Sequence, residues 1–343
     1  MTCLTHYTPP EPGRWTGRID DLEDRDAFRW HQVIEDLDLS ASTDGMDVAP
    51  SKGFCLLGYC CDRGVELNLG RTGADKGPEA IRAQLANLPV SFPRSVGLYD
   101  GGGIHCRNGD LQAAQRSLGE AVKRVLSLGL FPVVLGGGHD LAFGQYLGIS
   151  RHLPSSKRLG VLNFDAHLDL RPLRSGATSG TMFTQIEADC RERGADFSYF
   201  CVGPQKSANT VKLFRTAEEL SVGIVLARDM DDADLAPVKK RIDDFVSAND
   251  AIYLTICADV FSSAHAPGVS APQPFGLHPE TVLRLFKHAL ASGKVVSFDV
   301  AEVSPRFDSD DNTAKLAAVF VYALVNTVAL GHFSKLSRTA CQS

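Results

Sequence analysis

The segment NFDAHLDLR places two carboxylates and an imidazole at alternating positions, Asp165, His167 and Asp169, directly after the apolar run LGVLNF. In an extended chain such positions point to the same side, so the three side chains should converge on one small volume. Like charges held that close disfavour each other's ionised form, whereas a divalent metal ion makes the same cluster favourable. The pattern therefore predicts a metal site. The alternative is a solvent-exposed strand end with ordinary ion pairs.

A further candidate ligand, His139, follows three consecutive glycines at the end of the apolar run FPVVL. Glycine permits positive φ and close backbone approach, which a crowded site at a strand end requires. The segment has neither the Lys-Ser/Thr pair of a P-loop nor the GxGxxG spacing, so it does not indicate a phosphate-binding loop. We interpret the glycines as making room around His139, although a single histidine after a glycine turn is more often structural.

Two more apolar runs end in polar residues that carry chemistry. LTICADV presents Cys257 and Asp259 on one face of an extended chain, and SFDVAEV presents Glu302. Strand ends that offer histidines, acids and a thiol favour a metal-dependent hydrolase over a serine or cysteine hydrolase. The absence of a GxSxG nucleophile elbow from the sequence agrees with this interpretation.

Short apolar, β-branched runs alternate with longer segments of helical spacing, which predicts an α/β fold with a parallel sheet and helices on both faces. In open parallel sheets ligands bind outside the carboxyl ends of the strands, so the candidate residues should gather at one edge. The expected strands begin near residues 54, 131, 159, 199, 222, 251 and 295, and the clearest expected helices span 77–88, 110–129, 233–248 and 278–293.

Residues 1–50 lack this alternation and contain PPEPG and SASTDG, so we expect an N-terminal arm with one short amphipathic helix at 30–39. Residues 51–343 are expected to form a single domain that carries the candidate site. The sequence contains no internal repeat or long linker that would divide this part of the chain.

Composition excludes several classes of protein. The 343 residues are 44% hydrophobic and 22% charged with a net charge of -6, which predicts a globular protein that is not drawn to nucleic acid or to an anionic membrane. The first residues show no signal-peptide pattern, and we expect no run long enough to cross a bilayer. The nine cysteines are scattered and odd in number. Reduced thiols and a cytoplasmic location are therefore expected.

The segments GGGHD, DAHLD and CADVFSSAHAPGVSAP resemble, in this chain order, the three metal-binding signatures of the arginase, agmatinase and formimidoylglutamase superfamily. The resemblance extends to GRTGADKGPEAIR and AEVSPRFDSDDNTAKLAA, covers roughly residues 54 to 335, and is closest to the formimidoylglutamases. It implies a three-layer α/β/α sandwich around an eight-stranded parallel sheet, with a pair of Mn²⁺ ions as the cofactor. Carboxylate and imidazole ligands suit such a cation.

The resemblance also implies a role for each candidate ligand. His139, Asp165 and Asp169 would hold one ion, while Asp165 would also bridge to a second ion held by His167 and Asp259. Water between two cations becomes hydroxide near neutral pH and attacks an amidine or guanidine carbon. Asp169 would be a catalytic residue that hydrogen-bonds this hydroxide and passes its proton on.

Substrate-binding residues are implied in the same way. Glu302 corresponds to the family's catalytic carboxylate that receives a cationic amidinium or guanidinium. Arg171 lies two residues after Asp169, so it should face the same side and bind a substrate carboxylate, unless it pairs with a surface acid. Asn209 is a further predicted substrate ligand. Arginases place a proton-shuttling histidine where this chain has Phe183, which argues against an arginase.

Cys257 is the departure from the family pattern, because relatives have a metal-bridging Asp at this position. Its thiol could bridge as a thiolate, could leave one ion weakly held, or could simply fill space. Cys60 and Cys61 follow the first expected strand on a loop that should overhang the same site. We hypothesise that one of them forms a redox-dependent disulfide with Cys257, the alternative being three inert buried thiols.

The leading expectation for function is hydrolysis of N-formimidoyl-L-glutamate to L-glutamate and formamide in histidine breakdown. The partner would be this small-molecule substrate, and the protein would be a homo-oligomer. One alternative is another ureohydrolase that acts on a guanidino acid, arginine or agmatine. A second is a non-catalytic binding relative that lost a bridging ligand with Cys257, and such a protein should retain little or no Mn²⁺.

Overall fold

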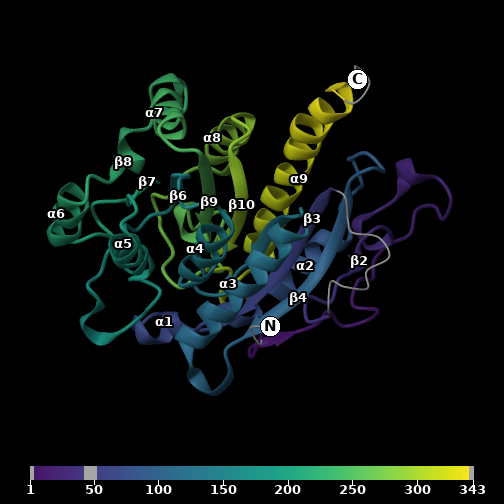
Figure 1. The fold of residues 1–343 in the computed structure, drawn as a ribbon, viewed down its shortest axis with the longest axis horizontal. Helices are drawn as coiled ribbons and strands as arrows, with labels where there is room; N and C mark the ends of the chain where they lie inside the picture. Colours follow the sequence, from purple (N-terminus) through teal and green to yellow (C-terminus); the bar gives the residue numbers. More distant parts are fainter. Residues whose placement is uncertain (1–3, 42–51, 340–343) are drawn as a thin grey trace.

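A single mixed sheet of ten strands forms the middle layer of the computed structural model, which describes residues 4–41 and 52–339 (Figure 1). The strand order is β1-β4-β3-β5-β10-β9-β6-β7-β8, and β2 also pairs with β4. The eight longer strands all run parallel, as predicted. They are β3 (Gly53–Cys60), β4 (Gly97–His105), β5 (Phe131–Leu135), β6 (Leu159–Phe164), β7 (Tyr199–Val202), β8 (Gly223–Val225), β9 (Ala251–Cys257) and β10 (Val295–Ala301).

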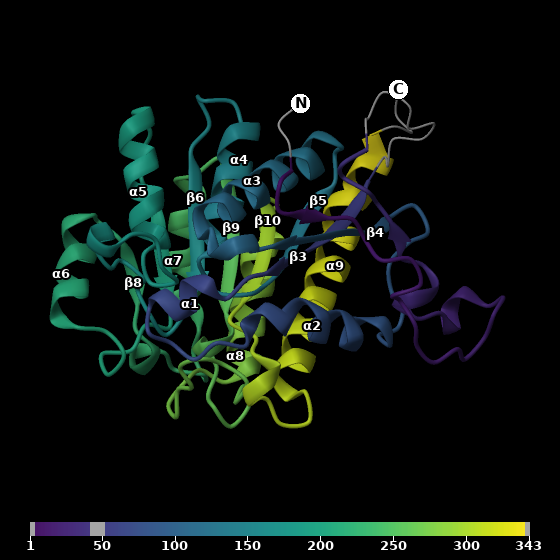
Figure 2. The same cartoon turned by 90° about the horizontal axis from the view of Figure 1, so that it is seen from below.

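Helices cover both faces of the sheet, which makes the predicted three-layer α/β/α sandwich (Figure 2). Buried side chains form two hydrophobic clusters, one on each face, and each cluster is completed by a different set of helices. The short α1 (Arg63–Leu67) lies in the loop after β3. One face carries α3 (Leu111–Ser127), α4 (Leu141–His152), α5 (Met182–Arg193) and α6 (Val211–Glu219), and the other carries α2 (Gly77–Ala86), α7 (Ala236–Ser247), α8 (Pro279–Ala291) and α9 (Asn312–Thr339).

Strand β4 is not among the seven strands expected from apolar runs, because its middle consists of glycines. Gly102 has a φ of 73°, a conformation that glycine adopts without strain. A Cβ atom at this position would lie 2.2 Å from the carbonyl oxygen of Thr8. The glycines thus let the N-terminal segment approach β4 closely enough to pair with it.

The N-terminal segment adds two short strands to the β4 edge of the sheet, β1 (Tyr7–Thr8) and β2 (Glu35–Asp36). The amphipathic helix expected at 30–39 is wrong, because this stretch forms a single 3₁₀ turn at Trp30–Gln32 followed by β2. Trp30 is fully buried in the core, and such tertiary contacts override local helical spacing. Positions 1–3 and 42–50 of the predicted arm lie outside the described residues.

Helix α9 contains a span, Asn312–Leu330, that is long and apolar enough to cross a membrane, with a mean hydropathy of 1.7. The expectation that the chain has no such run was therefore wrong. In the structure 61% of the span is buried, and the helix packs against α2 and α8. A mostly buried helix that packs against the core of a protein meets the same criterion of length and composition, and α9 is such a helix.

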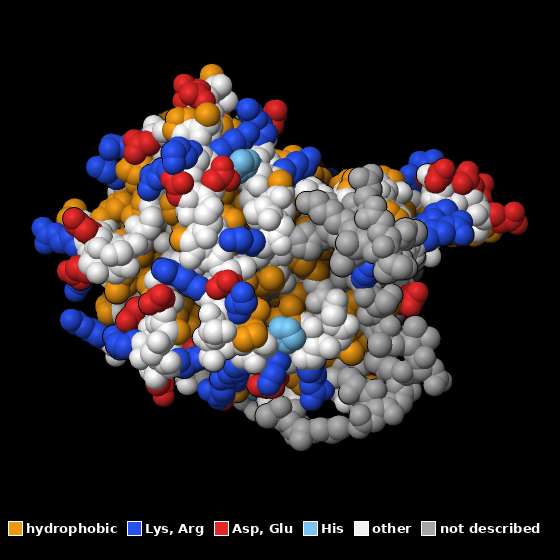
Figure 3. Space-filling view, turned by 45° about the horizontal axis from the view of Figure 1, so that its top comes forward, with side chains coloured by type: hydrophobic (Ala, Val, Ile, Leu, Met, Phe, Trp, Pro, Cys, Tyr) orange, Lys and Arg blue, Asp and Glu red, His pale blue; other side chains and the backbone are white. Residues whose placement is uncertain are grey.

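Charged side chains of both signs are interspersed over the face of the molecule seen in Figure 3. Lysines and arginines alternate with aspartates and glutamates rather than forming a field of one sign, in line with the small net charge of -6. Electrostatic steering of a polyion requires such a field, and this face does not supply one.

A buried ion pair joins the arm, the sheet and a helix. Arg82 of α2 donates through Nη2 to Asp100 of β4 at 2.8 Å, and these residues are only 5% and 1% exposed. The indole of Trp15 in the arm donates to the same carboxylate at 2.8 Å, and the Gly102 N–H donates to it at 3.0 Å. Hydrogen-bond donors of the protein therefore take the place of water around this carboxylate.

Replacing Asp100 should destabilise the fold strongly. In the Asp100→Asn variant the free energy of unfolding should fall by about 3–5 kcal/mol, because a buried charge on Arg82 loses its partner. Urea unfolding followed by circular dichroism measures the change. The matched control is Asp244→Asn, which breaks the exposed pair with Lys240 (2.9 Å) and should change stability by less than about 1 kcal/mol. Equal effects of the two substitutions would contradict the prediction.

Candidate metal centre

The candidate ligands lie at the carboxyl ends of four neighbouring parallel strands, β5, β10, β9 and β6. Asp165 follows β6 directly, Glu302 follows β10 directly, and Asp259 lies in a 3₁₀ turn immediately after β9. His139 follows β5 after the three glycines. Because parallel strands end at the same edge, residues from distant parts of the sequence meet in one place, as expected.

The imidazoles and carboxylates converge within ligand distance, and Asp165 is shared between the two histidines. His139 Nδ1 lies 3.0 Å from Asp165 Oδ2 and 3.5 Å from Asp169 Oδ2. His167 Nδ1 lies 3.1 Å from Asp259 Oδ2 and 3.5 Å from Asp165 Oδ1. The structure therefore presents two adjacent ligand groups with one common carboxylate, the arrangement that a pair of ions needs.

Cations fit these two groups. The ligand atoms of His139, Asp165 and Cys257 lie within 4.8 Å of one another, and so do those of Asp165, His167 and Asp259. Asp259 Oδ1 is buried without a hydrogen-bond partner, a costly state that a bound cation would relieve. A donor set of carboxylates and imidazoles with one thiol is compatible with Mn²⁺.

Without a cation, the cluster shares protons among its own groups. Burial tends to lower the pKa of His139, but Asp165 and Asp169 outweigh it and hold that pKa well above its usual value. Burial and the charge of Asp165 raise the pKa of Asp169. Burial likewise raises the pKa of the Cys257 thiol, with nearby carboxylates adding to the effect. Metal binding must displace these protons, so affinity should rise with pH.

Two of the site's acids have backbone conformations that are unusual for non-glycine residues. Asp169 has a φ of 48° and Glu302 a φ of 64°. The conformation of Glu302 is held in place because its N–H donates to Gly137 O at 2.8 Å while Oε1 accepts the His139 N–H at 2.9 Å. Backbone strain of this kind persists where the surrounding structure enforces it, commonly at functional sites.

A buried chain of hydrogen bonds fixes the orientation of His139. The hydroxyl of Thr255 donates to Asp299 Oδ1 at 2.7 Å, and Asp299 Oδ2 accepts from Tyr253 at 2.5 Å. His139 Nε2 lies 3.0 Å from the same Thr255 oxygen, which therefore accepts the Nε2 proton. This tautomer leaves a lone pair on Nδ1, the nitrogen that faces the two aspartates.

Thr255 and Asp299 were not among the residues singled out from the sequence. The signal for Thr255 was present, because it precedes Cys257 and Asp259 in the same alternating pattern. For Asp299, the signal was an acid in the middle of an otherwise apolar run, VVSFDVA. A carboxylate that is 0% exposed must have partners, and here they lead to the metal centre.

Comparison with known proteins decides the family. The sequence profile of the arginase family matches residues 52–326. This chain belongs to the arginase family. A formimidoylglutamase from Clostridium tetani is 48% identical over 94% of this chain and 97% of its own. Another, from Geobacillus thermodenitrificans, is 42% identical over 96% of this chain and 98% of its own. The resemblance inferred from the motifs is confirmed.

Solved structures of arginase-family proteins confirm the fold. Formimidoylglutamase from Bacillus subtilis superimposes with a TM-score of 0.77 at 23% identity, over 94% of this chain and 97% of that one. Formiminoglutamase from Trypanosoma cruzi, crystallised with Mn²⁺, superimposes with a TM-score of 0.73 at 26% identity, over 86% of this chain and 99% of that one. The α/β sandwich predicted from this arginase-family sequence is thus the observed one.

Asn209 has a different role from the predicted one. Its Oδ1 accepts the Leu168 N–H at 2.9 Å, and its Nδ2 donates to the carbonyls of Ala166 and Gln205 at 2.8 Å each. Both amide protons are therefore used on backbone groups, and none is left to donate to a substrate. Asn209 instead holds the loop that carries Asp165, His167 and Asp169.

Arg171 lies on the same loop with its side chain exposed and forms no ion pair with any described residue. Its N–H donates to Gly180 O at 2.9 Å. The side chain lies across Gly180, where a Cβ atom would come within 2.8 Å of Arg171 Cδ. The alternative interpretation, a pair with a surface acid, is thus absent from the described part of the chain, and the guanidinium is available to a carboxylate ligand.

The structure brings Cys257 into the metal centre but does not bring Cys60 or Cys61 to Cys257. All three thiols are free. Strands β3 and β9 are separated by β5 and β10, so three inter-strand steps of about 4.8 Å each lie between them. That separation exceeds the roughly 4.4–6.8 Å between Cα atoms that a disulfide spans. The predicted disulfide of Cys257 therefore finds no support in the strand order.

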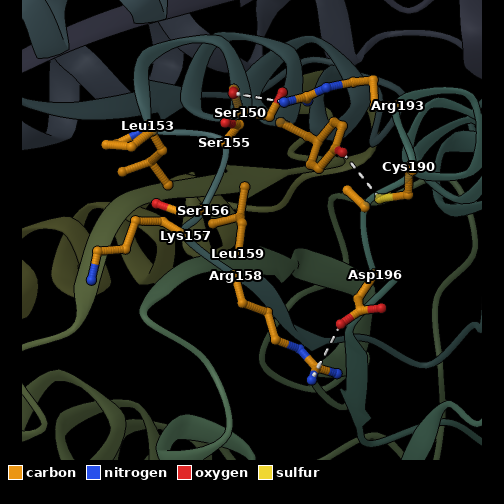
Figure 4. Close-up of a pocket in the computed structure, with 14 residues that line it drawn as sticks. Ser150, Leu153, Ser155, Ser156, Lys157, Arg158, Leu159, Cys190, Arg193 and Asp196 are labelled. Carbon is orange, nitrogen blue, oxygen red and sulfur yellow. Dashed lines mark hydrogen bonds and ion pairs between the residues drawn. The ribbon is translucent and has the colours of Figure 1, made fainter.

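A pocket of about 230 Å³ lies away from the metal centre, at the amino end of β6 (Figure 4). Its charged groups are already engaged, because Arg158 pairs with Asp196 at 3.5 Å and Arg193 Nη2 donates to Ser150 O at 3.2 Å. The described charged side chains of this pocket are therefore all paired, and the metal centre remains the candidate site.

Removing the Thr255 hydroxyl should weaken metal binding without removing a ligand. In Thr255→Val the tautomer of His139 is no longer fixed, and Mn²⁺ should bind roughly 10- to 100-fold more weakly. Isothermal titration of chelator-treated protein measures the affinity. Thr255→Ser keeps the hydroxyl and should bind within a few-fold of the parent protein. If both variants bind equally well, the hydroxyl does not orient His139.

Exchanging the thiol of Cys257 for a carboxylate should strengthen metal binding. In Cys257→Asp, Mn²⁺ affinity should rise on the order of tenfold, because Mn²⁺ prefers oxygen to a protonated thiol. The metal-free variant should melt at a lower temperature than the parent, since another acid joins a cluster that already repels. Thermal unfolding with and without Mn²⁺ measures both effects, with Cys257→Ser as control. Weaker binding by Cys257→Asp would indicate that the thiolate is the better ligand.

Proposed function

We propose that this protein hydrolyses the amidine C–N bond of N-formimidoyl-L-glutamate with Mn²⁺ as cofactor, giving L-glutamate and formamide. The observation that carries the proposal is a complete two-centre ligand cluster with an unpaired guanidinium, Arg171, on the same loop. Curated relatives that bear the name formimidoylglutamase and share 40–48% of residues with this chain support the choice of substrate. Water adds its oxygen to formamide and its protons to the two nitrogens.

Two Mn²⁺ ions would be held by His139, Asp165, Asp169 and Cys257 on one side and by Asp165, His167 and Asp259 on the other. Bound ions would lower the pKa of a water molecule and neutralise the negative charge that develops during the reaction. Asp169 stands at the edge of this cluster and accepts the proton that the attacking water loses. The same carboxyl group then delivers the proton to the leaving amine of glutamate.

Glu302 is placed to bind the reacting end of the substrate. Its Oε1 is occupied by the His139 N–H at 2.9 Å, which leaves Oε2 to accept an N–H from the amidinium. Burial raises the pKa of Glu302 to about 8, so a cationic partner is needed to keep it ionised near neutral pH. An amidinium supplies that positive charge, and its hydrogen bond to Glu302 orients it.

Arg171 is the proposed receptor for a substrate carboxylate. A guanidinium binds a carboxylate through two parallel hydrogen bonds, which fixes orientation as well as adding affinity. N-formimidoyl-L-glutamate carries two carboxylates beside its amidine. Agmatine has none and arginine adds an α-ammonium, so both suit this guanidinium less well.

The environment of Phe183 also disfavours an arginase. Phe183 is fully buried, stacks on Tyr199 with ring centroids 4.1 Å apart, and meets the His139 ring edge-on at 5.8 Å. Phe183 therefore packs against a metal ligand, and its side chain has no group that could donate or accept a proton, as the histidine of arginases does. The convergence of the other predicted ligands, His139, Asp165, His167, Asp169 and Asp259, likewise argues against a non-catalytic binding relative.

A homo-oligomer located in the cytoplasm remains our expectation. The described cysteines are all free thiols, which supports a reducing compartment. Size-exclusion chromatography with light scattering determines the oligomeric state directly.

The test is turnover of three substrates by reduced, Mn²⁺-loaded protein. N-formimidoyl-L-glutamate should be hydrolysed, with arginine and agmatine turned over at least about 100-fold less efficiently, as loss of one charged hydrogen-bonded contact implies. In Arg171→Gln, KM for N-formimidoyl-L-glutamate should rise by about 10- to 100-fold with kcat changed much less, because binding rather than chemistry is lost.

The matched control is Arg174→Gln, an exposed arginine three residues further along the same loop, which should leave KM unchanged. Hydrolysis of arginine or agmatine in preference to N-formimidoyl-L-glutamate would overturn the substrate assignment. Failure of protein with full Mn²⁺ content to hydrolyse any of the three would overturn the proposed reaction.

A further inference from the structure

Cys61 and Cys106 are neighbours across two adjacent strands. In the parallel pair β3 and β4, Cys60 is in register with His105, and the Cys106 N–H donates to Cys60 O at 3.5 Å. Cys61 and Cys106 are the next residues along the two strands. Adjacent strands are about 4.8 Å apart, inside the roughly 4.4–6.8 Å Cα separation that a disulfide spans.

The two side chains also lie on the same face of the sheet. Cys61 belongs to the hydrophobic cluster beneath α3 and α4, and Cys106 packs against that cluster. The Cys61 thiol is among the neighbouring groups that affect the pKa of Cys106. Cys60, which alternates with Cys61, lies on the opposite face, in a small pocket lined by Arg14 and His105. The strand register and the side on which the side chains lie therefore make Cys61, and not Cys60, the neighbour of Cys106.

Cys106 is the more exposed of the two residues. Cys106 is partly exposed, whereas Cys61 is only 1% exposed. A small oxidant can thus reach Cys106 first, after which Cys61 is the nearest thiol to resolve the product. This order resembles that of redox-sensor cysteines, in which an accessible thiol is oxidised and a neighbouring one closes the disulfide.

The backbone of Cys61 supports the metal centre. Its carbonyl accepts the N–H of Gly138 at 2.8 Å, and the carbonyl of Tyr59 accepts the N–H of Gly137 at 3.0 Å. These glycines directly precede His139. A Cβ atom on Gly137 would lie 2.3 Å from both carbonyl oxygens, so the two segments are in close backbone contact. A movement of Cys61 must therefore be transmitted to His139.

We propose that Cys61 and Cys106 form a reversible disulfide on exposure to a hydroperoxide, and that this bond weakens the metal centre. The Cys106 sulfur attacks one oxygen of hydrogen peroxide, the O–O bond breaks, and a sulfenic acid and one water are formed. The Cys61 sulfur then attacks the sulfenic sulfur and releases a second water. Two thiols lose two electrons and two protons, and hydrogen peroxide is reduced to two waters. A thiol reductant reverses the reaction.

Closing the bond shifts Cys61 toward β4 and away from the glycines before His139. Mn²⁺ affinity should therefore fall about tenfold on oxidation, a change of the size seen when a ligand loses its supporting contacts. Burial raises the pKa of Cys106, so the attacking thiolate is scarce at neutral pH and oxidation should be faster at pH 9 than at pH 7.

The experiment treats the full chain with hydrogen peroxide and maps disulfides by mass spectrometry after trypsin digestion. Cleavage after Lys52, Arg63, Arg94 and Arg107 places Cys61 in peptide 53–63 and Cys106 in peptide 95–107. The expected result is a linked pair of these peptides that disappears on reduction. Because peptide 53–63 also contains Cys55 and Cys60, the link must persist in Cys60→Ser and vanish in Cys61→Ser.

Isothermal titration with Mn²⁺ provides the second readout. Affinity should fall on oxidation of the parent protein and of Cys60→Ser, and should stay constant in Cys106→Ser. Absence of the linked peptides, their persistence in Cys61→Ser, or an unchanged affinity in fully linked protein would overturn the inference. The metal readout rests on the proposed metal centre, but the linkage does not. Failure of the proposed function appears instead as no turnover by reduced, metal-loaded protein.

Discussion

The carboxylate of Asp165 is 0% exposed and lies between two imidazoles and beside two further acids. Such a group cannot be transferred from water into a protein interior without compensation. The histidines and the amide around it supply that compensation. His139 and His167 keep the pKa of Asp165 low despite its burial, and the Asn163 amide donates to it at 3.2 Å. The rest of the site can be understood as the structure needed to hold these charges together.

The sheet provides that structure because it places four strand ends side by side. No one of these segments can make the cluster alone: the alternating acids come from the loop after β6, and the remaining ligands come from β5 and β9. The glycines before His139 allow its loop to lie directly on the backbone of the β3 segment. This close backbone packing restricts the movement of the loop. It also makes the geometry of the metal ligands depend on residues well outside the cluster.

Much of this arrangement could be predicted from the sequence, for reasons that are physical. Buried parallel strands need apolar, β-branched runs, so seven strands could be recognised, and polar residues at the ends of such runs indicated the site. Strand β4 was missed because the middle of the strand consists of glycines, which allow close contact with the arm, and not of apolar side chains. The helix expected at 30–39 was wrong because Trp30 is anchored in the core. The roles of Asn209 and Thr255 depend on hydrogen bonds between distant segments, which spacing along one chain does not reveal.

Helix α9 follows every strand of the sheet in the chain, yet it covers the middle of one face together with α2 and α8. During synthesis the strands and the helices α2, α7 and α8 emerge first, and the part of that face that α9 covers stays exposed until α9 has left the ribosome. A partly made chain therefore presents a broad hydrophobic surface and unprotected strands, the features that lead to aggregation. The order of the elements thus delays the burial of this part of the core to the last step of synthesis.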